Sequence, residues 1–86
     1  PFNIRVVSVS PGVVNTALME KTIKDSGEKL LDMICMRRPA NPEEIAQPIV
    51  FLASDAASYI TGTNLNITGG KLNVEDASLP WKSPWL

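Results

Sequence analysis

The stretch IRVVSVSPG, residues 4–12, decides the fold that we predict for this chain. It is rich in β-branched side chains, its apolar residues fall on both faces of an extended chain, and Pro11-Gly12 interrupts it. This pattern is typical of a strand that is buried on both sides in a parallel sheet. We therefore expect a strand over residues 3–10 and a loop over residues 11–16.

A second strand is expected over residues 63–68. Apolar and polar side chains alternate there, so that Leu65 and Ile67 would face inward and the neighbouring asparagines outward. Alternation of this kind indicates a half-buried strand, which we place at a sheet edge. Gly69-Gly70 ends the strand as a turn.

The four residues Asn41-Pro42-Glu43-Glu44 form the clearest local signal in the chain. Asparagine suits the N-cap, proline suits the first helical position, and Glu44 stands at capping-box spacing. We expect a helix over residues 42–58, in which the interior Pro48 predicts a kink or a tertiary reason for the proline. One stripe of this helix would be buried, consisting of Ile45, Ile49, Leu52, Ala53 and Ala56.

Residues 17–40 lie between the first strand and this helix, and we expect them to form a helical insert. Their apolar spacing indicates helix with a break at Ser26-Gly27, and Arg37-Arg38-Pro39 ends it because a residue before proline avoids the helical region. The order strand, insert, helix, strand predicts an α/β fold in which a right-handed crossover joins two parallel strands. A first strand that is covered on both sides needs a further neighbour, so we expect a fragment of a larger single domain.

Composition and charge exclude several classes of function. The chain has 86 residues, enough for one small domain, and its net charge of −1 excludes a nucleic-acid binder that relies on phosphate contacts. Its longest apolar run, residues 49–53, is far shorter than the roughly 20 residues that cross a membrane. Cys35 is the single cysteine and there is no histidine, which excludes a structural zinc site and histidine-based catalysis.

Several motifs together resemble the short-chain dehydrogenase/reductase family. Residues 3–16 are similar to its sixth strand and following loop, and residues 65–70 to its seventh strand, which ends in Gly-Gly. Residues 42–46 and 51–62 are similar to its last large helix and the turn after it. Each motif is weak by itself, whereas the three in this order and spacing are specific.

The resemblance implies both a fold and an activity. Residues 1–70 would be the C-terminal βαβ part of a Rossmann-like doubly wound parallel sheet, and residues 71–86 a tail. The intact protein would be a cytoplasmic enzyme that transfers hydride between NAD or NADP and a small-molecule carbonyl or secondary alcohol. It would form a homo-oligomer through the last helix and strand.

The same resemblance assigns cofactor-binding residues to the loop after the first strand. Val14 would bind the nicotinamide carboxamide through its backbone, and Thr16 would place its hydroxyl near the carboxamide or the phosphates. Pro11 and Gly12 would shape the loop and let the backbone approach the ring. The residues alone also allow a simpler interpretation, in which Pro11-Gly12 is a strand-ending turn and Thr16 a helix N-cap.

The insert corresponds to the variable region that covers the substrate in this family. Leu18 and Met19, with Met33 and Met36 further along, would line an apolar substrate pocket, although core packing explains the same residues. Arg37-Arg38 would bind an anionic substrate group or form a solvated pair at a helix C-terminus. The single cysteine is expected to be a small buried hydrophobe, because no histidine is present to activate it.

The family's catalytic set is not found in this chain. Its glycine-rich phosphate loop and its Ser and Tyr-x-x-x-Lys residues lie upstream of the matched part, so the chain alone is expected to be inactive. Tyr59 is the only tyrosine, and Thr63 stands where a catalytic lysine would follow, so we assign it to the turn. Val7 departs from the asparagine that is common in the family, and a proline inside the last helix is also uncommon.

Two other interpretations remain open. The chain would be a stand-alone, non-catalytic βαβ interaction module that uses its open sheet edge and the tail carrying Trp81 and Trp85, or a relative that binds cofactor without catalysis. The tail would reach a neighbouring subunit or the mouth of the pocket, or else be loose. Pro80 and Pro84 argue against a helix there.

Overall fold

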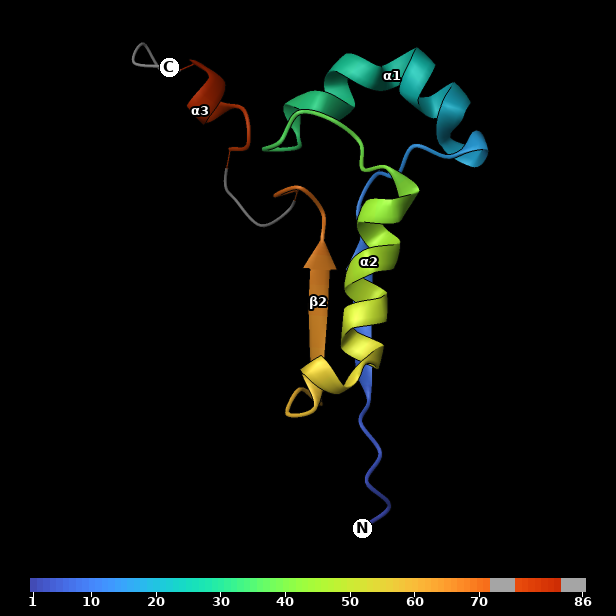
Figure 1. Cartoon of the computed structure of the whole chain (residues 1–86). Helices are drawn as coiled ribbons and strands as arrows, with labels where there is room; N and C mark the ends of the chain where they lie inside the picture. Colours follow the sequence, from blue (N-terminus) through green and yellow to red (C-terminus); the bar gives the residue numbers. More distant parts are fainter. Residues whose placement is uncertain (72–75, 83–86) are drawn as a thin grey trace.

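The computed structural model describes residues 1–71 and 76–82 of the chain. Its elements, in chain order, are β1 (Val7–Pro11), η1 (Ala17–Met19), α1 (Glu20–Asp32), α2 (Pro42–Ala53), η2 (Asp55–Ala57), β2 (Thr63–Ile67) and α3 (Leu79–Lys82). β1 and β2 form a parallel sheet with α2 alongside, and α1 lies beyond the end at which β2 finishes (Figure 1). The predicted α/β fold with parallel strands is therefore confirmed.

The two faces of the sheet differ in polarity. Val7 and Val9 line a cavity together with Leu52 of α2, so the alternate residues of β1 point to the opposite face. On that face Ser8 Oγ donates to Asn64 Oδ1 at 2.8 Å, across paired positions of the two strands. Hydrogen bonds between side chains thus accompany the backbone register.

β1 is shorter and more exposed than the sequence predicts. It begins at Val7, whereas Ile4 and Val6 are 74% and 69% exposed. Its residues alternate between half-buried and exposed up to Ser10. The expectation of a strand buried on both sides is wrong for the described residues, because they supply β1 with one neighbouring strand and one covering helix.

Helix α2 begins where the sequence predicts and ends earlier. The capping box of Asn41 and Glu44 is present, and the helix continues through Pro48. It stops at Ala53 instead of residue 58, because Ser54 is extended and its Oγ donates to the Phe51 carbonyl at 2.6 Å.

The early end of α2 changes which of its side chains are buried. Leu52 is buried and Ile45 half-buried, as the predicted stripe requires, whereas Ile49 is 42% exposed. Beyond the helix end, Ala57 of η2 is buried and Ala56 is exposed. The predicted stripe is therefore wrong at Ile49 and Ala53, which are exposed within the helix, and at Ala56, where the chain no longer follows the helical period.

The insert contains the predicted break. Ser26 has non-helical backbone angles (φ −129°, ψ 20°) inside α1. Neither η1 nor α1 buries any residue, and within the insert the buried side chain is that of Ile34, which follows the helix end. Core packing therefore does not explain Leu18, which is 90% exposed.

The tail corrects a further expectation. Residues Leu79–Lys82 form the short helix α3, although Pro80 lies within it. A proline in the first turn is tolerated because its missing N–H has no helical partner there. Trp85 lies outside the described residues. Among the described residues, no helix is long and apolar enough to cross a membrane.

Candidate functional site

An isolated parallel β-bridge to Ala40 fixes the position of the Val14 backbone. Ala40 N donates to the Val13 carbonyl at 2.9 Å, and Asn15 N donates to the Ala40 carbonyl at 2.8 Å. In a parallel bridge these two bonds flank the central residue, whose own N–H and C=O then point to the other side. The Val14 N–H and C=O have no hydrogen-bond partner within residues 1–71 and 76–82. One donor and one acceptor are what a carboxamide requires.

Gly12 brings the ends of the two strands together. Its N–H donates to the Ile67 carbonyl at 2.9 Å. A Cβ at this position would lie 3.0 Å from Thr68 Cα, so the glycine permits a close approach between two backbones. The backbone that Gly12 approaches here is that of Thr68, and its predicted approach to the nicotinamide ring stays a prediction. Pro11 is the last residue of β1 and not the first of a loop, which agrees with the strand-ending interpretation.

A cavity of about 520 Å³ opens at the carboxyl ends of both strands. Ligands of open α/β sheets bind beyond these ends. The cavity brings three predicted site residues together, Pro11, Gly12 and Met19. Its other lining residues are Ser10, Val13, Asn66, Thr68 and Lys71.

Five of the lining residues were not predicted as site residues: Val13 lies inside the predicted loop, and the other four are Ser10, Asn66, Thr68 and Lys71. Ser10 and Asn66 are register partners, so knowledge of the strand pairing would have placed them side by side. Thr68 and Lys71 flank Gly69-Gly70, and their approach to the first loop depends on the Gly12 contact described above. The missing signal is therefore the register, which a single sequence does not contain.

Val14, Thr16 and Leu18 lie outside the lining of this cavity. Thr16 occupies the N-cap position of η1, and its carbonyl accepts from Met19 N at 3.0 Å, but its side chain forms no cap bond. The hydroxyl is exposed and is not used as a helix cap. Leu18 points into no described cavity, so its predicted role in a substrate pocket has no support from this geometry.

Other apolar residues of the insert line a separate cavity of about 660 Å³ under α1. They include Ile23, Leu30 and Leu31, which sequence reasoning had treated only as helix periodicity. Met36, 57% exposed, borders a smaller cavity of about 130 Å³, while Met33 borders none of the described cavities. Of the three methionines, Met19 alone borders the cavity at the strand ends, and its contact with a substrate stays a prediction.

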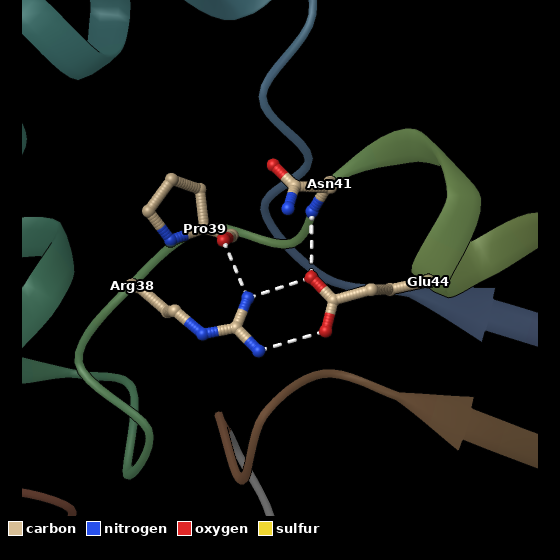
Figure 2. A network of polar contacts seen from close by, with 4 residues as sticks. All are labelled: Arg38, Pro39, Asn41 and Glu44. Carbon is tan, nitrogen blue, oxygen red and sulfur yellow. Dashed lines mark hydrogen bonds and ion pairs between the residues drawn. The ribbon is translucent and has the colours of Figure 1, made fainter.

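The end of the insert is fixed to α2 by an ion pair (Figure 2). Arg38 donates to both carboxylate oxygens of Glu44, at 2.6 and 2.7 Å, and the Asn41 N–H donates to the same carboxylate at 3.0 Å. Arg37 also pairs, with Asp32 at 3.1 Å. Both arginines thus form ion pairs, and their side chains remain partly solvated, with Arg37 36% and Arg38 46% exposed.

These contacts predict a pH effect on stability. Hydrogen bonds from Arg38 and from the Asn41 N–H lower the pKa of the Glu44 carboxyl to about 2, from an ordinary 4.5. A carboxyl whose pKa is lower in the folded state stabilises the fold fully above pH 4.5 and loses that contribution as the pH falls towards 2. We expect urea unfolding to show this loss in the wild type and not in Glu44→Gln.

The matched control is Glu43→Gln, because the Glu43 carboxylate makes no ion pair among the described residues. This variant should keep the pH dependence of the wild type. If the difference in stability between the wild type and Glu44→Gln stays constant from pH 4.5 down to 2, the ion pair does not stabilise the fold.

Comparison with known proteins gives consistent matches. The family model described as enoyl-(acyl carrier protein) reductase matches residues 1–71. A 3-oxoacyl-[acyl-carrier-protein] reductase of Thermotoga maritima is 47% identical over 68 residues, which is 79% of this chain and 28% of that protein. A cyclopentanol dehydrogenase of Comamonas is 42% identical over 72 residues, which is 81% of this chain and 29% of that protein.

Solved structures agree with these matches. A 4-hydroxyisoleucine dehydrogenase complexed with NADH superposes with a TM-score of 0.78 at 35% identity, covering 85% of this chain and 31% of that chain. A short-chain dehydrogenase/reductase of Brucella melitensis gives a TM-score of 0.72 at 36% identity, covering 77% and 27%. The chain thus spans less than a third of the length of these relatives.

Proposed function

The chain belongs to the short-chain dehydrogenase/reductase family, and we propose that it forms the nicotinamide-side part of an NAD(P)-dependent oxidoreductase. The relatives described above are oxidoreductases by name, and one is complexed with NADH. The observation that carries the proposal is the Val14 peptide, whose N–H and C=O are both unpaired in the described residues and lie in the loop at the strand ends.

Each residue of the loop has a role in this proposal. The Val14 N–H and C=O bind the carboxamide and so fix which face of the nicotinamide is presented to the substrate. The Thr16 hydroxyl, which caps no helix, donates to the carboxamide or to a phosphate. Pro11 and Gly12 end the strand and hold the two loops close together.

The cofactor, when bound, supplies or accepts the hydride. In this proposal the chain positions the nicotinamide ring and covers the substrate. Met19 borders the cavity at the strand ends and provides an adaptable apolar wall for a carbonyl or secondary alcohol substrate. The acid that exchanges a proton with the substrate oxygen belongs to the upstream part of the family's pattern. Tyr59 is fully exposed in the turn before β2, so it does not take that role.

Helix α2 and strand β2 form the subunit contact in this proposal. On α2 the neighbouring residues Val50 and Phe51 are 68% and 47% exposed, whereas Ile49, 42% exposed, borders the cavity against β1. The two exposed apolar side chains offer a surface to a partner. The same surface is the observation that favours the alternative function, a non-catalytic βαβ interaction module.

The proposal is tested by measuring hydride transfer with the protein that the complete reading frame encodes. The purified protein is mixed with NADH or NADPH and with acetoacetyl-CoA or cyclopentanone, and nicotinamide absorbance is followed. We expect turnover with one of the cofactors, and none from the 86-residue chain alone. If calorimetry shows that the complete protein binds neither cofactor, the interaction module becomes the preferred function.

A further inference from the structure

The last residues of the insert lie between two other segments of the chain. On one side, the Met36 N–H donates to the Gly69 carbonyl at 3.0 Å, and a Cβ on Gly70 would lie only 2.6 Å from Cys35 Cβ. On the other side, Trp81 Nε1 donates to the Cys35 carbonyl at 2.7 Å. These partners of Cys35 are 35 and 46 residues away in sequence, so the contacts are tertiary.

Arg37 connects the same place to helix α1. Its guanidinium carbon lies 5.9 Å from the centre of the Trp81 ring, within the range of a cation–π contact. Its Nη1 also lies 3.1 Å from Asp32, the last residue of α1. The Arg37 backbone has a positive φ of 55°, which is uncommon for a residue with a side chain. Trp81 thus contacts two residues at the end of the insert, Cys35 and Arg37.

The segment that carries Trp81 is itself ordered by local contacts. Asp76 Oδ1 accepts from the Ser78 N–H at 3.0 Å and from the Ser78 hydroxyl at 2.7 Å. Ala77 and Ser78 are both buried, at 7% exposure. The Trp81 N–H donates to the Ser78 carbonyl at 3.0 Å. The indole therefore projects from a segment with its own fixed geometry.

The rest of the insert has few contacts that could fix it. Neither η1 nor α1 has a buried residue, and Ile34 is the buried residue of the insert. Met19, at the start of the insert, nevertheless borders the cavity at the strand ends. The angle of the insert relative to that cavity is consequently set at its base, by residues 34–38 with their partners and by the bridge between Val14 and Ala40.

We propose that residues 76–82 act as a strap that fixes the insert beside the cavity at the strand ends, and that Trp81 is a positioning residue for substrate binding. The substrate-binding part of this inference rests on the proposed function, in which the insert covers the substrate. The strap acts through the backbone of Cys35 and the side chain of Arg37, and it touches neither substrate nor cofactor.

The test uses the complete protein with Trp81→Phe, which keeps a ring and loses the N–H donor, and with Trp81→Ala. The control is Lys82→Ala, because Lys82 follows Trp81 in α3 and its side chain makes no hydrogen bond or ion pair within the described residues. Limited trypsin digestion reports cleavage within α1 after Lys21, Lys24 and Lys29. Loss of one hydrogen bond should speed this cleavage about fivefold in Trp81→Phe, since cleavage follows the population of the open form. The alanine variant should be faster still, and the control unchanged.

Enzyme kinetics supply the second measurement. Both Trp81 variants should raise the KM for the carbonyl substrate, with kcat and the affinity for the nicotinamide cofactor close to those of the wild type. Cleavage in α1 that does not change in either variant overturns the strap, as does cleavage that rises equally at sites outside the insert. If α1 is selectively loosened but the wild type transfers no hydride, the strap stands and the proposed function fails.

Discussion

Replacing Gly70 by alanine is expected to destabilise the folded protein by about 3 kcal/mol. Gly70 has a φ of 93°, and the new Cβ would lie 2.6 Å from Cys35 Cβ and 2.8 Å from Cys35 Sγ. An L-residue at positive φ costs about 1–2 kcal/mol, and forcing an extra methyl group into an occupied place costs about 1–3 kcal/mol. The neighbouring backbone cannot easily yield, because Met36 N is bonded to the Gly69 carbonyl.

Gly27→Ala is the matched control for this prediction. Gly27 lies within α1, and a Cβ there would meet no atom within 4 Å. The same substitution should therefore stabilise the helix by about 0.5–1 kcal/mol, because alanine loses less backbone entropy than glycine on folding. Urea unfolding of both variants measures the contrast. If Gly70→Ala unfolds at the same urea concentration as Gly27→Ala, Gly70 does not pack against Cys35 in the folded protein.

This pair of glycines shows where sequence reasoning succeeds and where it stops. Gly69-Gly70 was predicted to end a strand, and β2 does end at Ile67. The reason that side chains are excluded there is the packing of the insert against the turn. Two consecutive glycines predict a turn, but they do not indicate which distant segment packs against that turn.

The same division holds for the helices. The start of α2 was predictable because Asn41 and Glu44 are three residues apart and act locally. Its end was not predictable, because apolar spacing continues beyond Ala53 while the Ser54 hydroxyl binds the preceding turn. The break in α1 at Ser26 was readable from Ser-Gly, which favours irregular backbone.

For the candidate site, the loop was predictable and its neighbours were not. Val14 and Thr16 were assigned to the cofactor loop because the family's motif is continuous in sequence, and their role stays a prediction. Thr68 and Lys71 line the cavity at the strand ends because of the strand register, and Trp81 reaches the insert across 46 residues. Leu18 was assigned to the pocket because the resemblance places it in the substrate-covering insert, and it is 90% exposed outside the lining of the cavity.

Val14→Pro is expected to weaken binding of the nicotinamide cofactor about tenfold. Proline removes the N–H that would bind the carboxamide oxygen, and it leaves that oxygen without its donor in the site. The fold should tolerate the change, because the bridge to Ala40 uses the Val13 carbonyl and the Asn15 N–H. Proline also favours an extended residue before it, and Val13 already lies at this bridge. Fluorescence titration with NADH measures the affinity in the complete protein.

Two controls separate loss of this donor from general damage to the loop. Val14→Ala keeps the backbone N–H and should bind NADH almost as the wild type does, because the proposed contact belongs to the peptide and not to the side chain. ADP-ribose lacks the nicotinamide, so Val14→Pro should bind it with unchanged affinity. Equal weakening towards NADH and ADP-ribose would mean that proline distorts the loop and that the Val14 N–H is not a carboxamide donor. If Val14→Pro weakens the binding of NADH but not of ADP-ribose, the nicotinamide lies at the end of β1. The nicotinamide is the part of NADH that ADP-ribose lacks.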